Sequence, residues 1–416
     1  MAVPKLRFKE FDGDWSNKKI GNIASKVGSG STPRGGAEAY TDHGIIFIRS
    51  QNVNNDQLLL DDVAYIPEET HVKMSGSKVI ANDILLNITG ASIGRSCVVP
   101  HDFTEANVNQ HVCIIRTPND DPIFVQSFLS SENGQNAIQS KQAGGGREGL
   151  NFQAIRSIDF HFPPSKAEQT KIASFLSAVD EKISQLTQKH ALLSQYKQGM
   201  MQKLFSQQIS FKADDGSEFG EWGEYKIFDL AIDKTLNNGV FNDQNKVGKG
   251  YKLINVLDMY IQRDIDESRL SLLDIDKKEF ERNKVNYGDI FFTRSSLVKE
   301  GIAFSNVYLG VSNDITYDGH LIKLSPDLNI IEPKFLNYCL KVAYVRKQLI
   351  QGGKTATMTT IGQQEVGNTL VKIPCLEEQI RIANFLSAID QKIDVVSKQI
   401  EQAKQWKKGL LQQMFI

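Results

Sequence analysis

Few residue groupings in this chain could carry out chemistry, and each lacks part of the pattern that its chemistry requires. Gly353-Lys354-Thr355 matches the end of a phosphate-binding loop, but Gln348 stands where that loop needs its first glycine. The prolines of Phe162-Pro-Pro-Ser165 lack the leading Asn or Asp and the trailing aromatic residue of an adenine methyltransferase. Asp327 and Glu332 resemble nuclease carboxylates, yet they lie only five positions apart with a proline directly after, which leaves little room for adjacent strands. We therefore predict no catalytic residues and no enzyme activity.

The cysteines and histidines do not predict a metal site. No C-x-x-C spacing occurs and no histidine lies at zinc-site intervals, so neither a metal ion nor a disulfide framework is expected. The longest apolar runs fall far short of the roughly 18 residues of a membrane-spanning helix, and charges occupy the N-terminus where a signal peptide needs its apolar core. We expect a cytoplasmic protein without a membrane partner, and four free thiols: Cys97, Cys113, Cys339 and Cys375.

The composition is that of a globular protein of two to three domains. The chain has 416 residues, of which 40% are hydrophobic and 23% charged. Lys plus Arg number 48 against 49 for Asp plus Glu, a net charge of -1. Because this balance gives no overall attraction to nucleic acid, any DNA-binding surface must be a local one.

An internal repeat is the strongest pattern in the sequence. Residues 164–183 and 374–393 align without a gap at an offset of 210, and 12 of the 20 positions are identical. The same offset relates residues 196–205 to 406–415. Since no residue is inserted or lost, each copy is expected to be a rigid element of fixed length.

Both copies predict a long helix. Apolar residues step four and three alternately, which is the spacing of a coiled-coil seam, and Lys197 and Lys407 interrupt the two seams at equivalent positions. Ser165 is a predicted N-cap with Glu168 completing a capping box, of which the second copy keeps Glu378. About 40 residues give a rod of about 60 Å. Two matched stripes favour an intramolecular antiparallel coiled coil over two separate core helices.

The segments before the two helices also correspond, though more loosely. Trp15 matches Trp222, and strand-like residues 45–48 match 251–254. Alternating apolar residues with Gly, Asn and Asp punctuation predict strands and turns, followed in each half by a helical stretch (124–138 or 335–350) and a glycine loop. The expected fold class is α+β with a pseudo-two-fold repeat, in four segments: 1–163, 164–208, 209–373 and 374–416.

These features together resemble the specificity subunits of type I restriction-modification enzymes over essentially the whole chain. The most specific part is P-x-x-x-E-Q-x-x-I-A-x-F-L-S-A-x-D-x-K-I, present at 164–183 and again at 374–393, and the opening Pro4-Lys-Leu-Arg-Phe8 is also similar to that family. The resemblance implies two α/β target-recognition domains. Each would read one half of a split, asymmetric site on double-stranded DNA, and the two helices would set the gap between the halves.

The resemblance also implies partner subunits. Two methyltransferase (modification) subunits would dock on this frame and methylate adenine at N6, and restriction/translocase subunits would add ATP-dependent cleavage. S-adenosylmethionine, ATP and Mg would belong to these partners, so no cofactor is expected here. A chain with two equivalent halves can offer two equivalent docking surfaces. The candidates lie on the helix faces outside the seam, where capping and local packing are the alternative explanation: Glu168, Gln169, Phe175, Asp180, Glu378, Gln379, Phe385 and Asp390.

Reading bases requires polar side chains at loop tips, with glycines that allow close approach of the backbone. The candidates in the first domain are Arg34, Arg49, Gln51, Asn52, Thr89, Ser92, Arg95, Asn109, Gln110 and Arg147. The candidates in the second domain are Asn255, Thr293, Arg294, Ser295, Ser296, Lys299, His320, Lys354 and Thr355. Arg147 and Arg294 are the strongest, because a charge in a glycine loop or at a strand end can enter a groove.

Two other functions remain open from the residues. One is a coiled-coil adaptor or scaffold whose globular domains bind a peptide or small ligand, which suits the charge balance but does not explain the helix motif. The other is a fused single-chain restriction or methylation enzyme, which would need a catalytic motif that the sequence lacks.

Overall fold

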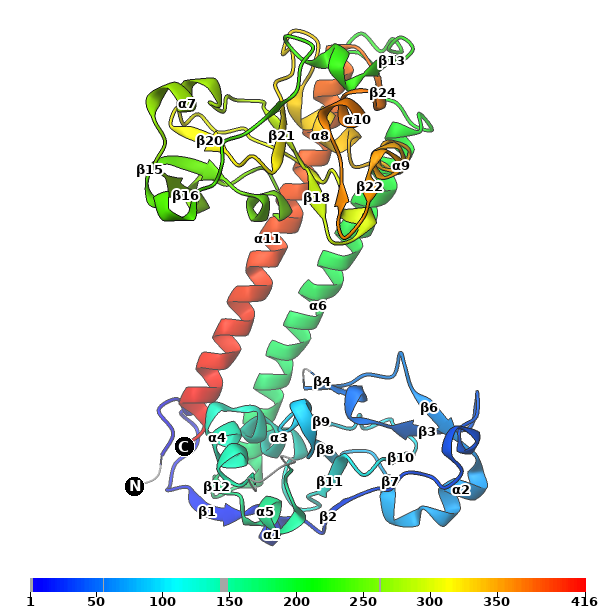
Figure 1. Ribbon diagram of the computed structural model, residues 1–416. Coiled ribbons are helices and arrows are strands. Elements are labelled where there is room, and N and C mark those ends of the chain that lie inside the picture. The colour runs from blue at the N-terminus through cyan, green and yellow to red at the C-terminus, as the bar shows by residue number, and fades with distance from the viewer. Residues whose placement is uncertain (1–2, 55, 143–148, 262) are drawn as a thin grey trace. The chain divides into compact units, whose positions relative to one another are not determined.

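The computed structural model describes residues 3–54, 56–142, 149–261 and 263–416. Its contacts separate into two compact units, Met1–Gln188 with Lys398–Ile416, and Lys189–Ser397. Each unit holds one α/β domain and one half of each of two long helices, α6 (Lys166–Phe205) and α11 (Leu376–Met414) (Figure 1). No helix in the described ranges is both long and apolar enough to cross a membrane.

The domain of the first unit is built on two sheets. Their strand orders are β6-β3-β10-β7 and β2-β11-β8-β9, while β1 pairs with β12 and β4 with β5. The strands are β1 (Ser16–Lys19), β2 (Lys26–Ser29), β3 (Ile45–Ile48), β4 (Val53–Asn54), β5 (Gln57–Leu58), β6 (Ala64–Ile66), β7 (Lys78–Val79), β8 (Ile84–Asn87), β9 (Ser96–Val98), β10 (Ala106–Val108), β11 (Val112–Arg116) and β12 (Asp159–Phe162). The short helices are α1 (Ile20–Ile23), α2 (Glu68–Lys73), α3 (Pro122–Ser130), α4 (Glu132–Ser140) and α5 (Phe152–Ser157).

The domain of the second unit repeats this plan. Its strand orders are β16-β15-β20, β14-β21-β17-β19 and β18-β23-β22, and β13 pairs with β24. The strands are β13 (Gly223–Lys226), β14 (Asn237–Asn238), β15 (Val247–Ile254), β16 (Ser271–Leu273), β17 (Ile290–Thr293), β18 (Ser295–Ser296), β19 (Ser305–Val307), β20 (Ile315–Tyr317), β21 (Leu321–Leu324), β22 (Lys354–Thr355), β23 (Thr359–Thr360) and β24 (Leu370–Ile373). The short helices are α7 (Lys277–Arg282), α8 (Pro333–Cys339), α9 (Ala343–Gly352) and α10 (Gln363–Gly367).

The strand register matches single positions of the first domain to single positions of the second. β10 runs parallel to β3 with Val108 opposite Ile48, and β20 runs parallel to β15 with Tyr317 opposite Ile254. In each domain a glycine follows the strand that precedes this pair in the chain, β2 or β14, because the backbone there crosses the end of the pair. A Cβ at Gly30 would lie 1.6 Å from the carbonyl oxygen of Val108, and one at Gly239 would lie 2.0 Å from that of Tyr317. The predicted repeat of the globular segments is therefore confirmed.

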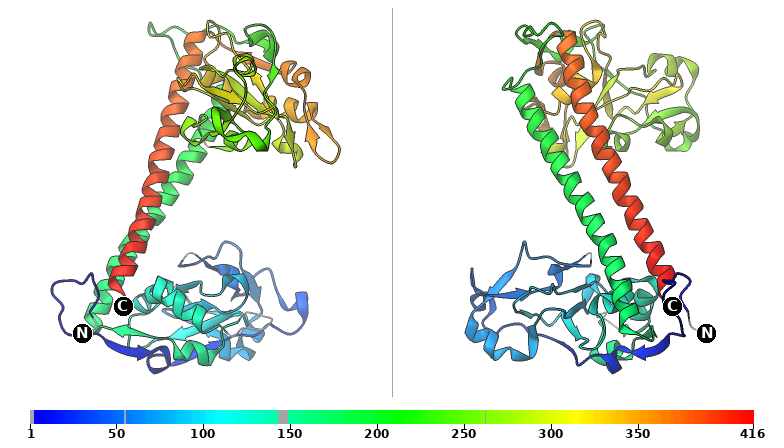
Figure 2. Two further views of the ribbon diagram at one scale, coloured as in Figure 1. Left: turned by 60° about the vertical axis from the view of Figure 1, so that its left-hand side comes forward. Right: turned by 180° about the vertical axis from the view of Figure 1, so that it is seen from behind.

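The long helices pack against each other within each unit in opposite directions. In the first unit, Leu176 near the start of α6 shares a buried cluster with Leu410 near the end of α11. In the second unit, Leu204 near the end of α6 shares a cluster with Leu386 near the start of α11. Figure 2 shows these helix segments side by side from two further directions. The predicted antiparallel coiled coil is confirmed.

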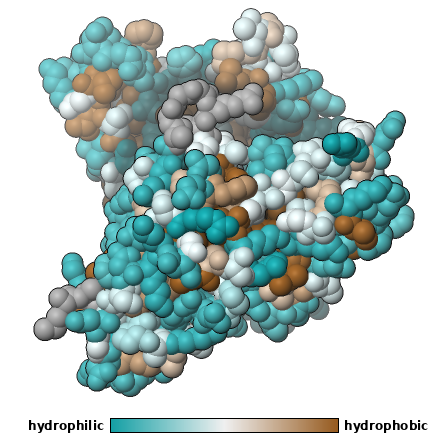
Figure 3. Space-filling view, turned by 90° about the horizontal axis from the view of Figure 1, so that it is seen from below, coloured by the Kyte–Doolittle hydropathy of each residue, from teal (hydrophilic) through white to brown (hydrophobic). Residues whose placement is uncertain are grey.

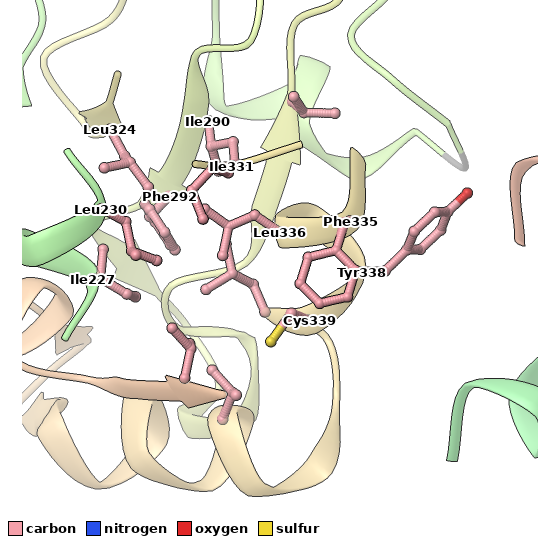
Figure 4. Close-up of a cluster of buried hydrophobic side chains, with 14 of the residues drawn as sticks. Ile227, Leu230, Ile290, Phe292, Leu324, Ile331, Phe335, Leu336, Tyr338 and Cys339 are labelled. Atoms are coloured by element: carbon pink, nitrogen blue, oxygen red, sulfur yellow. The ribbon is translucent and has the colours of Figure 1, made fainter. Parts of the chain in front are cut away.

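Each domain rests on its helix segments through an aromatic and aliphatic core. In the second unit, Phe292 of β17 and Leu324 of β21 face Phe335 and Leu336 of α8 (Figure 4), and the same cluster extends to α6 and α11. Where one continuous helical stretch was expected, each domain has two helices, α3 and α4 or α8 and α9. In the first domain Ser131 ends α3 with ψ 162° and caps α4 through a bond from the Gly134 amide.

The predicted capping box is only half formed. Oγ of Ser165 accepts the amide of Glu168 at 3.3 Å, as expected of an N-cap. The Glu168 carboxylate, however, accepts bonds from Nε of Arg7 at 2.7 Å and from Nε1 of Trp15 at 3.2 Å. In the second unit Glu378 accepts the equivalent bond from Nε1 of Trp222 at 3.1 Å. These acids thus attach the opening segment of each half to its helix.

The two seam lysines form equivalent ion pairs with the opposite helix. Nζ of Lys197 lies 2.6 Å from Asp390, and Nζ of Lys407 lies 2.7 Å from Asp180. Lys407 also binds Asp56 of the first domain at 2.8 Å. Burial alone would raise the pKa of Asp56, but Lys407 holds it below its usual range. The interruptions of the seams are therefore polar contacts that fix helix register and, in the first unit, attach the domain.

The buried amine of Lys341, in the turn between α8 and α9, should make the stability of the second unit depend on pH. Burial lowers its pKa to about 8, with Lys197 adding to this effect and Asp390 and Asp264 opposing it. The pKa of an unfolded lysine is about 10.4, so between about pH 8 and pH 10.4 the unfolded chain binds more protons. The free energy of unfolding should rise with pH over this window. Lys341→Met should abolish this contribution and stabilise the chain at pH 7 by about 1–3 kcal/mol.

Urea denaturation at pH 7 and pH 9.5 measures this effect. Lys347→Met is the matched control, because Lys347 is an exposed lysine on α9 of the same unit. An equal pH response in Lys341→Met and Lys347→Met would contradict the prediction.

Candidate nucleic-acid interface

A hydrogen-bonded set of polar side chains joins three loops of the second domain. Nδ2 of Asn242 donates to Oδ1 of Asn255 and to Oδ2 of Asp318, both at 2.9 Å. Oδ1 of Asp318 accepts the backbone amide of His320 at 2.7 Å and lies 2.8 Å from Nδ1 of its ring. The His320 side chain is exposed while Asp318 is buried, so the carboxylate orients an imidazole that faces solvent.

Arg294 connects a second group of predicted residues to this set. Its backbone amide donates to the carbonyl of His320 at 2.9 Å, and its Nη1 donates to the carbonyl of Gly319 at 3.1 Å. Ser295 and Ser296 of β18 pair with β23, which pairs in turn with Lys354 and Thr355 of β22. Lys299 follows on the exposed 3-10 helix η9 (Lys299–Gly301). Residues distributed from 255 to 355 are thus brought to one group of loops.

Thr293 is the exception among the second-domain candidates. It is fully buried, and its Oγ1 accepts the backbone amide of Phe304 at 3.0 Å. Because the hydroxyl accepts this bond in the interior, at the end of β17, this side chain is not available to a ligand in this structure.

The first domain holds an equivalent polar set around His111. Nδ1 of His111 lies 2.6 Å from Oγ1 of Thr89, and Nε2 lies 3.0 Å from Nε2 of Gln110. Oε1 of Gln110 accepts the hydroxyl of Thr32 at 2.6 Å. Asn109 is nearly buried and accepts the amide of His111 at 3.0 Å, so it shapes the turn rather than facing solvent. His111 follows β10 where His320 follows β20, which confirms the correspondence of the two sets.

Three further candidates of the first domain gather at the end of β3. Arg49 and Gln51 both contact Asp62, at 3.6 Å and 2.8 Å. Asn52 is buried and accepts the Arg49 amide at 2.9 Å while donating to two backbone carbonyls, so its role is structural. The Asn109 amide donates to the carbonyl of Ile48, which places this group beside the His111 set.

The remaining first-domain candidates are less closely connected. Arg34 is exposed two residues after Thr32. Ser92 is half-buried and its carbonyl accepts the Arg95 amide, while the exposed Arg95 side chain lines a hollow with Asp56 and Gln135. Arg147 lies outside the described residues. The face of the first unit drawn in Figure 3 is predominantly hydrophilic, with hydrophobic side chains in small separate patches.

The two sets present hydrogen-bond donors and acceptors that are held in place by one another. Amides, hydroxyls and imidazoles that hold one another by hydrogen bonds are preorganised to meet the edges of base pairs, and nearby Arg and Lys side chains can contact phosphates. In the described part of the chain, no three His, Cys, Asp or Glu residues gather as metal ligands would. Sequence reasoning missed Asn242, Asp318 and His111. The shared position of His111 and His320 in the repeat was the available signal for His111.

The predicted partner-binding side chains are all in contacts within their own units. Glu168, Gln169, Glu378 and Gln379 are buried, Asp180 and Asp390 bind lysines, and Phe175 and Phe385 pack edge-to-face on Phe8 and Phe211. These contacts support the packing alternative for this group. Tyr196 and Trp406, which are equivalent at the offset of 210, are instead 51% and 54% exposed on the helices.

Comparison with known proteins identifies the family to which both copies of the repeat belong. The family model for the type I restriction modification DNA specificity domain matches residues 12–195 and 220–405, once in each half. The MjaX specificity subunit of a type I restriction enzyme from Methanocaldococcus jannaschii is 27% identical over 215 residues, which cover 51% of this chain and only 49% of that relative. The EcoKI specificity subunit of Escherichia coli K12 is 22% identical over 370 residues, 86% of this chain and 77% of that protein. The crystal structure of the type I restriction-modification S subunit from M. genitalium aligns over 100% of this chain and 99% of its own, with a TM-score of 0.62 and 16% identity, and so shares the fold.

Proposed function

Because the chain belongs to the family of type I restriction-modification DNA specificity subunits, we propose that it selects the DNA sequence on which such a complex acts. The observation that carries this proposal is the pair of equivalent polar loop sets, one in each copy of the specificity domain. A single set could belong to many kinds of binding protein. Two sets at the same positions of a repeat support recognition of two separated stretches of one long ligand.

The two loop sets also support an asymmetric site. The first presents Thr32, Thr89, Gln110 and His111, whereas the second presents Asn242, Asn255 and His320 with Arg294 beside them. Direct readout depends on the pattern of donors and acceptors, so different sets select different base pairs. We infer a bipartite site whose two halves differ in sequence, with a gap set by the helices.

The chemistry would be supplied by partner subunits. The relatives are named as subunits of restriction enzymes, which supports assembly with modification and restriction subunits. We infer that two methyltransferase subunits dock and methylate adenine at N6, that restriction/translocase subunits cleave with ATP, and that the bound S-adenosylmethionine, ATP and Mg lie on those partners. Tyr196 and Trp406 are the best placed anchors for two copies of one partner, since exposed aromatic side chains often dominate binding at interfaces.

Methylation mapping tests the proposal. The chain is expressed with its methyltransferase partner in a host without adenine methylation, and the genome is sequenced for N6-methyladenine. A split motif with a fixed gap is expected, and the motif should vanish when this chain is omitted. If the complex assembles but leaves no methylated motif, the chain is a scaffold for another ligand. Methylation by this chain without the partner would indicate a fused enzyme instead.

A further inference from the structure

Three large apolar side chains stand in solvent around the polar loop set of the second domain. Phe241 is 80% exposed, Leu257 82% and Leu297 85%. Phe241 directly precedes Asn242, and Leu257 lies two residues after Asn255, to which Asn242 is hydrogen-bonded. Leu297 lies in the loop that follows Arg294 and β18. These residues, here called the apolar rim, therefore come from the same loops as the polar set.

The first domain places polar residues at two of these positions. Gly30 and Gly239 occupy the same crossing over β10 and β20, so Phe241 corresponds to Thr32. The second match comes from the 3-10 helices η2 (Ser50–Asn52) and η7 (Val256–Tyr260). In each, the backbone amide of the N-cap residue, Arg49 or Asn255, donates to the side chain three residues later. Arg49 thus corresponds to Asn255, and Gln51 to Leu257.

The third apolar residue belongs to an insertion. After β8, the Gly94 amide donates back to the Asn87 carbonyl, seven positions earlier. After β17, the Ala303 amide donates back to the Thr293 carbonyl, ten positions earlier. The stretch between Thr293 and Ala303 is thus three residues longer than its counterpart, and it contains the exposed Leu297 between β18 and η9. At these three places the second domain therefore has an exposed apolar side chain where the first domain has a polar one or no equivalent residue.

We propose that the second domain recognises thymine through its 5-methyl groups, which the apolar rim contacts in the major groove, whereas the first domain reads its half-site with polar side chains at the same positions. Among the groups that base pairs present in the major groove, the thymine methyl is the one that favours apolar contact. Phe241 and Leu257 lie one and two residues from Asn242 and Asn255 of the polar set, so DNA that meets this set also meets the loops that carry the rim. The inference rests on the proposed DNA-recognition function.

Replacing thymine by deoxyuridine tests the proposal, because deoxyuridine pairs with adenine in the same way and lacks only the methyl group. The assembled complex with its methyltransferase partner is titrated with duplexes of the mapped site that carry deoxyuridine in one half-site at a time. Burial of one methyl-sized group corresponds to about a fourfold change in affinity. We expect the Kd to rise about fourfold or more for each contacted thymine in the half-site of the second domain, and to stay unchanged for the other half-site.

Variants assign the effect to the rim. The variants Phe241→Ser and Leu257→Gln remove the apolar contacts and should bind the thymine and deoxyuridine duplexes equally. Val311→Thr is the control, because Val311 is also exposed but lies before β20, whereas Asp318 and His320 of the polar set follow that strand. The control should retain the full preference for thymine.

Each other outcome has a defined meaning. If the complex binds no specific sequence, the proposed function fails. If it binds its site with the same affinity for both duplexes, DNA recognition stands and the thymine proposal is overturned. If the rim variants lose the methyltransferase partner but keep the preference for thymine, the rim is a protein-docking surface and the proposal is also overturned.

Discussion

Exchanging residues 209–373 for the same domain of another specificity subunit should change one half of the methylated motif completely and leave the other half and the gap unaltered. The loop set of the second domain lies wholly within this segment, whereas the loop set of the first domain and the whole of both long helices lie outside it. Mapping of N6-methyladenine in the host genome would report both halves and the gap at once.

The exchange must preserve the contacts by which the domain rests on the helices. Trp222 donates to Glu378 of α11, and Phe335 lies 5.4 Å from the ring of Phe205 on α6. A donor domain that keeps Trp222 and Phe335 should therefore fold on the foreign frame. The reciprocal exchange of residues 1–163 is the control, and it should change only the opposite half. Changes in both halves after either exchange would refute independent reading by the two domains.

The long helices were predictable because their signal is local and repeated. The period of the apolar residues and the gapless offset specify helix length, and the two equivalent lysines already marked where polar contacts interrupt the seam. The assignment of Glu168 to a partner surface shows the limit of this reasoning. Its two partners, Arg7 and Trp15, lie more than 150 residues earlier in the chain. Helical period identifies which face is polar but gives no information on what that face contacts.

The candidate DNA interface was only partly predictable for a similar reason. Loop position identified Arg294, His320 and Gln110, which the structure places in the two polar sets. It could not separate them from Thr293 and Asn52, whose polar atoms satisfy backbone groups in the interior. Asn242 was missed because it acts through two hydrogen bonds to distant residues. Only the fold decides whether a polar side chain supports a loop or faces a ligand.

Arg116→Met should destabilise the first unit by about 3–5 kcal/mol, because it removes the cation that neutralises a fully buried carboxylate. Nε and Nη2 of Arg116 donate to the two oxygens of Asp83 at 2.6 Å and 2.8 Å, and Asp83 has no exposed side-chain surface. The amide of Ile80 supplies one further bond at 2.9 Å. Hydrogen exchange followed by mass spectrometry should show faster exchange in β8 and β11 of the first unit and little change in the second.

The equivalent pair in the second domain provides the comparison. Nζ of Lys323 lies 3.4 Å from Asp289, which also accepts bonds from the Ser325 hydroxyl at 2.6 Å and the Asn286 amide at 2.8 Å. Burial raises the pKa of Asp289, so this carboxyl group takes up a proton more readily once its cation is removed. Lys323→Met should therefore cost less than Arg116→Met. Adding Asp83→Asn to Arg116→Met should recover most of the lost stability, since the buried charge is then gone. A double variant as unstable as Arg116→Met alone would show that the loss arises from packing of the arginine side chain and not from the stranded carboxylate.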